Sequence, residues 1–269
     1  MGRFEPIHDA HAIEQVALVL QTARPLDDAQ IAGASEAAER FKSELPGVAQ
    51  IQQFSFGFGT IGALPRVPVP FAGRVLTKTR PDGVIESELR LERGAITFRT
   101  TAYTRWDAIW AQARRYFETL LPFYVPASEI GAVALNYVDK FYWDGDVTEM
   151  RPKALLRPGS PYVCPHVYDA RDLWHSHMGS FEAIDEVAKR LLNINLDCND
   201  ENQPQKRRVV SVTTVLTDML GQPGYVAPEL ANSGVEFFCE RAERLHSGSK
   251  STLAAILDDQ MCRRIGLKD

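Results

Sequence analysis

The feature that most constrains the fold is a run of three short β-rich segments separated by two tight turns. Pro81-Asp82-Gly83 separates the first two segments, and its proline, aspartate and glycine each favour a turn for a different physical reason. Arg93-Gly94 separates the last two. Turns this short join strands that lie antiparallel in a sheet. The sequence therefore predicts an antiparallel β-meander with strands over 74–80, 84–92 and 95–103.

A strongly amphipathic segment follows the meander directly. Thr104 is a residue type that caps helices, and apolar side chains then recur at the three- and four-residue spacing of one helix face. Pro122 and Pro126 bound the segment on its C-terminal side. This pattern predicts a helix over 105–121 that packs on the sheet through Trp106, Ile109, Trp110, Ala113, Phe117 and Leu120.

The rest of the chain alternates between β-rich and helical segments in a similar way. Further strands are expected at 15–23, 48–59, 130–145, 189–198 and 206–220, with a weaker one within 164–181. A helix is expected over 28–45, and the C-terminal stripe predicts two more, over 235–245 and 253–265, with Ser249 or Ser251 restarting the helix. Breaker-rich or polar segments predict loops at 60–73, 199–205 and 221–229.

This element order predicts an α+β fold in which amphipathic helices pack on one face of an antiparallel sheet. The order reads β-α-β-β-β-β-α and then β-(β)-β-β-α, so the halves 1–128 and 129–269 could repeat one structural plan within a single compact unit. No Gly-x-Gly-x-x-Gly sequence follows a strand, and no phosphate-binding P-loop is present. Nucleotide-binding folds are therefore not expected.

Composition and charge exclude several broad classes. Hydrophobic residues make up 45% of the 269 residues, enough for a substantial core, and charged residues make up 24%. The net charge of −5 gives no general attraction for nucleic acid. No apolar run approaches the roughly 18–20 residues of a membrane helix, and the polar N-terminal segment does not resemble a secretory signal. The four cysteines form no Cys-x-x-Cys pair, so we expect reduced thiols and a cytoplasmic location.

Three segments together carry a resemblance to a group of known proteins. They are AITFRTTAYTRWDAIWAQ (95–112), IGAVALNYVDKFYWD (130–144) and LHSGSKSTLAAILDDQMCRRIG (245–266). In this order and spacing the chain resembles a sporadically distributed family of uncharacterised bacterial proteins of similar length. Leu135 stands where that family usually has arginine, and Asp139 replaces its second asparagine. The resemblance implies no activity or catalytic residue, but the patchy distribution implies an association with mobile elements or phage defence.

The densest group of potential metal ligands lies within CPHVYDARDLWHSH, residues 164–177. It contains two pairs of residues that are two positions apart, and on a strand each pair would point to one face. Such ligands suit a tetrahedral zinc site formed by Cys164, His166, His175 and His177. The spacing matches no known zinc signature, and Pro165 interrupts strand geometry. The alternative is a polar segment whose histidines form surface hydrogen bonds, in a protein with no cofactor.

Two polar pairs are further candidates for a site. Asp139 and Lys140 lie in the middle of the strand expected at 130–145, where a charge on the inward face would be functional or paired. On an edge, the same charges would face water. His8 and His11 lie close together near the N-terminus, but a general base also needs a pocket and an orienting partner. Polar residues near a terminus are usually solvated.

Two tryptophans lie outside every apolar stripe of the sequence. Trp143 and Trp174 are each flanked by charged residues, and aromatic side chains rimmed by polar groups often anchor a partner or ligand. The alternative is that both cap the edge of the core. A basic cluster, Lys206-Arg207-Arg208 with Lys189 and Arg190, could contact phosphates. Because acidic residues surround it, a solubilising hairpin end explains it more simply.

The sequence contains no nucleophile motif of the Gly-x-Ser-x-Gly type. We therefore expect a non-enzymatic binding or accessory protein that acts through a protein partner or a small ligand, with no catalytic residues. The candidate binding residues are Trp143, Trp174, Asp139 and Lys140. The alternatives are a metal-dependent hydrolase that uses the 164–177 cluster and a nucleic-acid-binding effector that uses the basic cluster.

Overall fold

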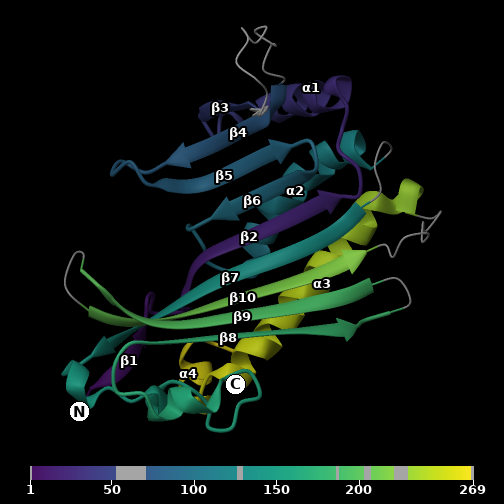
Figure 1. Cartoon of the computed structure of the whole chain (residues 1–269). Coiled ribbons are helices and arrows are strands. Elements are labelled where there is room, and N and C mark those ends of the chain that lie inside the picture. The colour runs from purple at the N-terminus through teal and green to yellow at the C-terminus, as the bar shows by residue number, and fades with distance from the viewer. Residues whose placement is uncertain are drawn as a thin grey trace, which may run out of the picture.

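The chain forms one antiparallel sheet covered by helices on one face, as a computed structural model shows (Figure 1). The structure describes residues 2–52, 71–125, 130–185, 188–202, 207–220 and 230–267. The strands are β1 (Arg3–Pro6), β2 (Ile13–Thr22), β3 (Gly47–Gln52), β4 (Phe71–Thr79), β5 (Ile85–Glu92), β6 (Ala95–Thr100), β7 (Ile130–Asp144), β8 (Trp174–Ala183), β9 (Ala188–Glu201) and β10 (Arg207–Leu220). The helices are α1 (Asp28–Ala37), α2 (Trp106–Tyr124), α3 (Leu230–Ile256) and α4 (Asp259–Arg264). The expected α+β fold is confirmed.

The strand order across the sheet is β3-β4-β5-β6-β2-β7-β10-β9-β8, and β1 pairs with the C-terminal end of β7. The predicted meander corresponds to β4, β5 and β6. In each half of the chain the first long strand, β2 or β7, lies at the centre next to the last strand of its half. Because β2 pairs with β7 over nearly its whole length, the two halves share a single sheet.

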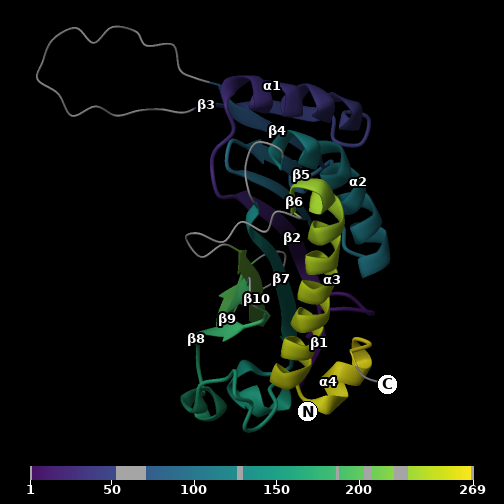
Figure 2. The same cartoon turned by 90° about the vertical axis from the view of Figure 1, so that its right-hand side faces the viewer.

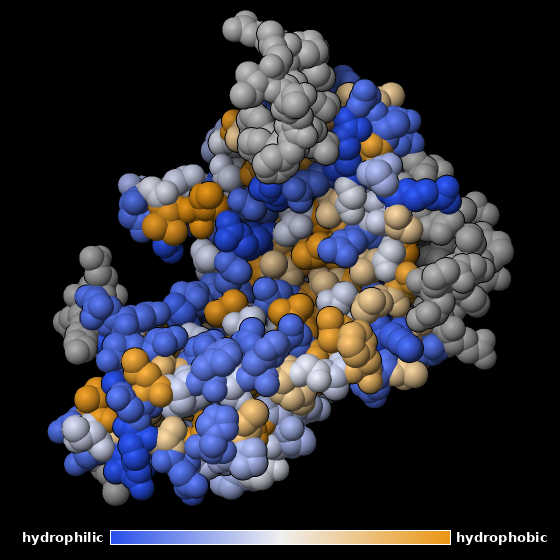
Figure 3. Space-filling model, in the orientation of Figure 1, coloured by the Kyte–Doolittle hydropathy of each residue, from blue (hydrophilic) through white to orange (hydrophobic). Residues whose placement is uncertain are grey.

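Helices α1, α2 and α3 lie on the same face of this sheet (Figure 2). Side chains beneath them form two hydrophobic clusters. The first cluster lies between α1, α2, the first part of α3 and the strands from β4 to β7. The second lies between the end of α3, α4 and the strands β7 to β10. The other face of the sheet carries polar and apolar side chains side by side (Figure 3).

Several local features differ from the sequence-based expectations. The C-terminal helix α3 runs without interruption from Leu230 to Ile256, so the predicted restart at Ser249 or Ser251 is wrong. Pro122 lies inside the last turn of α2 rather than beyond it. Strand β1 was not predicted at all. The expectations for 53–59, 60–70, 203–205 and 221–229 fall outside the described residues. None of the helices in the described ranges has the length and apolarity that crossing a membrane requires.

A buried ionic cluster fixes α3 against the sheet. The carboxylate of Asp218 on β10 is fully buried. Arg190 on β9 donates two hydrogen bonds to it, at 2.7 and 3.0 Å, and Arg241 on α3 donates a third at 3.5 Å. Two turns further along α3, a Cβ atom on Gly248 would lie only 2.9 Å from Leu216 Cδ2. The helix therefore lies close to β10, and its height above the sheet is set by these two contacts.

We expect Asp218→Ala to lower the free energy of unfolding by about 3–5 kcal/mol, because it leaves the largely buried Arg190 without its anion and leaves Arg241 paired with Asp185 alone. Urea denaturation followed by far-UV circular dichroism measures this loss. The control is Asp197→Ala, which removes a hydrogen bond with His175 on the uncovered face and should cost less than about 1 kcal/mol. Similar stabilities for the two variants would contradict this account of how α3 is held.

Candidate functional site

Three polar side chains occupy positions that the packing pattern assigns to apolar residues. On the inward face of β7, Asp139 lies between Tyr137 and Phe141, and on β10 Thr214 lies between Val212 and Leu216. On the inward stripe of α3, Ser249 lies between Leu245 and Leu253. In each element the apolar residue on one side belongs to the first hydrophobic cluster and that on the other side to the second. The polar residues therefore mark the boundary where the core divides.

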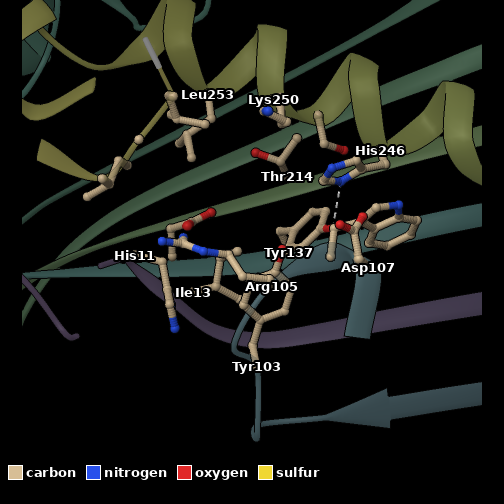
Figure 4. Close-up of a pocket in the computed structure, with 16 residues that line it drawn as sticks. His11, Ile13, Tyr103, Arg105, Asp107, Tyr137, Thr214, His246, Lys250 and Leu253 are labelled. Atoms are coloured by element: carbon tan, nitrogen blue, oxygen red, sulfur yellow. Dashed lines mark hydrogen bonds between the residues drawn. The ribbon is translucent and has the colours of Figure 1, made fainter. Parts of the chain in front are cut away.

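A cavity of about 380 Å³ lies at this boundary (Figure 4). Its floor is formed by the sheet, with Tyr137, Asp139 and Thr214. Its roof is α3, from which His246, Ser249, Lys250 and Leu253 project at the i, i+3, i+4, i+7 spacing of one helix face. The segment that leads from β6 into α2 forms one wall with Tyr103, Arg105, Trp106 and Asp107, and His11 and Ile13 lie beside it.

The interior of this cavity carries polar atoms that the chain itself does not satisfy. Eight buried side-chain nitrogen or oxygen atoms among the described residues have no hydrogen-bond partner. Four of them belong to cavity residues, namely His11 Nδ1, Asp139 Oδ1, Thr214 Oγ1 and Ser249 Oγ. A buried polar atom without a partner costs about 1–3 kcal/mol. Such a concentration in one cavity is unfavourable for folding alone and suits a site that receives hydrogen bonds from a bound molecule.

Asp139 is the most strongly perturbed carboxyl group of the cavity. Its side chain is only 2% exposed, and burial raises its pKa to about 7, because removal from water disfavours the charged form. Among the residues described, no basic side chain forms an ion pair with it. Near neutral pH this carboxyl group can therefore either accept or donate a proton.

His246 is held between two aromatic side chains. Its Nδ1 atom lies 3.0 Å from the Tyr137 hydroxyl, and its ring stacks on Trp106 with a centroid separation of 4.2 Å (Figure 4). Burial, assisted by the nearby charge of Lys250, lowers the pKa of His246 to about 4. Burial also raises the pKa of Tyr137 above its usual range. At neutral pH the imidazole is uncharged, so Nδ1 can accept the hydrogen bond that the phenol donates.

The opposite wall is aromatic too, whereas the rim is charged. Tyr103 contacts both His11 and Tyr137 edge to face, with centroid separations of 5.2 and 6.1 Å, and burial raises its pKa to about 12. Burial and the neighbouring His8 lower the pKa of His11. The side chains of Arg105, Lys250 and Asp107 are exposed, so the opening of the cavity carries two positive charges and one negative charge.

The structure places Lys140 away from this cavity, although it follows Asp139 in the sequence. Because successive side chains alternate along a strand, Lys140 projects from the uncovered face of the sheet. There its ammonium group lies 2.7 Å from both Glu14 and Glu201. Of the predicted pair, only Asp139 belongs to the candidate site.

The prediction that Trp143 and Trp174 anchor a partner is wrong, because both are buried. Their exposed fractions are 7% and 8%, and both belong to the second hydrophobic cluster. The Trp143 indole donates a hydrogen bond to the carbonyl oxygen of Asp146 at 2.9 Å, which satisfies its polar atom inside the fold. The sequence signal was misleading because each tryptophan lies near a strand end, where charged neighbours on the other face or in the next loop surround it.

The predicted zinc ligands do not converge. His175 and His177 project from the uncovered face of β8, where they contact Asp197 and Asn193. Ser176, between them, faces the covered side, and the backbone of Cys164 lies against it at 3.4 Å. His166 is exposed on the 3₁₀ turn Pro165–Asp169. Within the described ranges, no group of three His, Cys, Asp or Glu side chains is placed to hold a metal ion.

Two residues of the predicted basic cluster are occupied by internal ion pairs. Arg208 is buried and forms two hydrogen bonds with Asp200, at 2.7 and 3.1 Å. Arg190 is bound to Asp218, as described above. Lys206 lies outside the described residues. Arg190 and Arg208 thus contribute to the fold, whereas Lys189 and Arg207 are exposed and Arg207 lies over the ring of Tyr142.

Sequence reasoning missed most of the site. His11 was considered only as part of a solvated pair, and Tyr137, Thr214, His246 and Ser249 were not considered as site residues. A signal was present in each element, because a polar residue lies between two apolar residues of the inward row. Recognising that these interruptions coincide required the register of β7 with β10 and the position of α3 above them.

Comparisons with known proteins add no functional information. The sequence matches none of the protein-family models against which it was compared, and a search of curated proteins gave no significant match.

The raised pKa of Asp139 predicts how stability depends on pH. The folded state binds this proton more tightly than the unfolded state, so Asp139 destabilises the fold increasingly as pH rises from about 4 through 7. Asp139→Asn should therefore gain stability over wild type as pH rises. The gain at pH 8 should be on the order of 3–4 kcal/mol at most, from a shift of roughly three pKa units.

Urea unfolding of both proteins at several pH values between 4.5 and 8 tests this. The lowered pKa of His246 makes the free energy of unfolding rise with pH below pH 6.5, opposite to the effect of Asp139. The informative quantity is therefore the difference in unfolding free energy between variant and wild type at each pH. Thr213→Val, on the uncovered face, serves as a control. Its free energy of unfolding should differ from that of wild type by the same amount at every pH. A constant difference for Asp139→Asn would show that the carboxyl group is not perturbed by burial.

Proposed function

We propose that this chain is a binding protein for a small polar organic molecule, which it holds in the cavity between α3 and the sheet. The observation that carries the proposal is the gathering of four unpartnered buried polar atoms around one cavity. They come from three strands or helices and from the segment before β2, so a single local irregularity does not explain them.

The size and composition of the cavity support the same proposal. Its volume of about 380 Å³ is within the range of pockets that bind small organic molecules, roughly 300–1,000 Å³, and far exceeds the space of one ion. Aromatic side chains form the walls, and a few polar groups converge inside. This combination is common in ligand sites, where the apolar walls supply affinity and the polar groups supply orientation.

A purely binding role also fits the chemistry of the residues present. His246 is a weak base, because its pKa is lowered to about 4, and its Nδ1 atom is hydrogen-bonded to the Tyr137 hydroxyl. The cavity contains Ser249 and Thr214, but neither hydroxyl has a hydrogen bond to a base that would activate it as a nucleophile. These statements concern the described residues. Asp139 can exchange a proton near neutral pH, but neither cavity hydroxyl is hydrogen-bonded to it as an activated nucleophile would be, so we favour recognition over catalysis.

Thermal unfolding in the presence of a library of small polar metabolites tests the proposed function. A ligand present at about 100 times its Kd stabilises the fold by about 2.7 kcal/mol, which raises Tm by roughly 5–10 °C for a chain of this size. We expect at least one compound to give such a rise with wild type. Failure of every compound, or an equal rise when the cavity is altered, would contradict the proposal.

Thr214→Val provides the altered cavity. Removing a buried hydroxyl that has no partner should leave the fold intact and raise the free energy of unfolding by up to about 1 kcal/mol. The same change should reduce the ligand-induced rise in Tm. The matched control is Thr213→Val on the opposite face of β10, which should change neither quantity. A Thr214→Val protein that is less stable than wild type would show that the hydroxyl already has a partner in the free protein.

A further inference from the structure

The cavity also indicates what chemical class of ligand it receives, an inference that depends on the proposed function. The unpartnered atoms on the floor and roof include the oxygens of Asp139, Thr214 and Ser249. A carboxylate accepts hydrogen bonds, and both hydroxyl oxygens can accept as well. Because these three oxygens come from β7, β10 and α3, the group that satisfies them together must donate several hydrogen bonds in different directions.

The charge balance around Asp139 is incomplete. This carboxyl group is buried and, among the described residues, has no basic partner. A buried ionised carboxylate is costly unless a cation is paired with it. The basic residues of the cavity, Arg105 and Lys250, are exposed at the rim, and Arg105 donates a hydrogen bond to the carbonyl oxygen of Ala10 at 3.2 Å.

The cavity walls suit a cation as well. The rings of Tyr103, Trp106 and Tyr137 line the space, and aromatic faces attract ammonium groups. A carboxylate combined with aromatic rings is therefore more favourable for a cationic amine than for a neutral or anionic group. The volume of the cavity leaves room for an organic body attached to that amine.

We propose that the cavity binds a small organic amine, whose ammonium group donates hydrogen bonds to Asp139, Thr214 and Ser249. An ammonium group carries three donors and one positive charge, which matches three acceptors and one negative charge. Lys250 and Arg105 outnumber Asp107 at the opening, and this net positive charge favours amines that also carry a carboxylate or phosphate over simple amines. The ligand class is that of amino acids and related zwitterions.

Matched pairs of compounds test this inference by thermal unfolding of the full chain. The amines are the standard L-amino acids, 4-aminobutyrate and tyramine, and the analogues without an amine are 3-phenylpropionate, butyrate and 4-ethylphenol, each at about 5 mM. We expect at least one amine to raise Tm by several degrees, while its analogue without the ammonium group has no effect. If none of the amines raises Tm, the inference is overturned.

Variants then locate the two charges of the best amine. Asp139→Asn should weaken its binding roughly 10- to 100-fold, as loss of a charge-assisted hydrogen bond does. The variant is expected to be at least as stable as wild type, so loss of binding through unfolding would be recognised from its Tm. Lys250→Gln should weaken binding of amino acids but not of tyramine. Thr213→Val should bind like wild type.

The outcomes separate this inference from the proposed function. If 3-phenylpropionate or another compound without an amine stabilises wild type but not Thr214→Val, the cavity binds a ligand and only the assignment of an amine fails. If an amine binds equally to wild type and Asp139→Asn, its ammonium group lies elsewhere and the inference is overturned. If no compound of the panel or of the metabolite library depends on cavity residues, both proposals fail.

Discussion

Strand β7 is paired on both sides and lies beneath α3, so every second side chain along its 15 residues must fit between the sheet and a helix. Most of these positions are apolar, as dense packing requires. Asp139 is the exception, and its side chain is only 2% exposed in the folded chain. The structure around it has to accommodate a buried polar group, and the cavity is the result.

This constraint explains why the core is divided. A carboxyl group packs poorly against aliphatic side chains, and a threonine and a serine accompany it from β10 and α3. If all three positions were apolar, α3 could pack continuously on the sheet, and the two hydrophobic clusters would merge. The sequence instead keeps three groups that each weaken the fold, which is common where a protein needs a defined binding site.

The fold was largely predictable from the sequence, whereas the site was not. Tight turns such as Pro81-Asp82-Gly83 and the alternating pattern of 130–145 act over a few residues, so they identify the strands and their antiparallel pairing. The helix restart at Ser249 was a misinterpretation of the same kind of local signal, because a serine within a helix also marks a polar position on its buried face. Only the three-dimensional position of Ser249 above Thr214 and Asp139 shows that this serine marks a polar position on the buried face and not the start of a new helix.

For the tryptophans, the sequence pattern indicated the wrong degree of exposure. Trp143 and Trp174 stood out because charged residues surround them in the sequence, yet both are buried in the fold. Trp106 was assigned to a helix stripe that packs on the sheet; it does pack against the first hydrophobic cluster, but it is only half-buried and also stacks on His246 at the cavity wall. Exposure of a large side chain depends on which element covers it, and no pattern within a single segment contains that information.

The cavity depends on parts of the chain that are remote in sequence. His11 precedes β2, Asp139 and Thr214 lie on neighbouring central strands, and Gly266 follows α4 at the edge of the same space. Helix α3 is held at its height by Arg241 at Asp218 and by the close approach of Gly248 to Leu216. The polar groups of the cavity therefore meet only after the sheet and α3 have assembled. The ionic cluster at Asp218 lies outside the cavity and positions α3 over the sheet. The polar atoms of the cavity can therefore lack hydrogen-bond partners and still keep their relative positions.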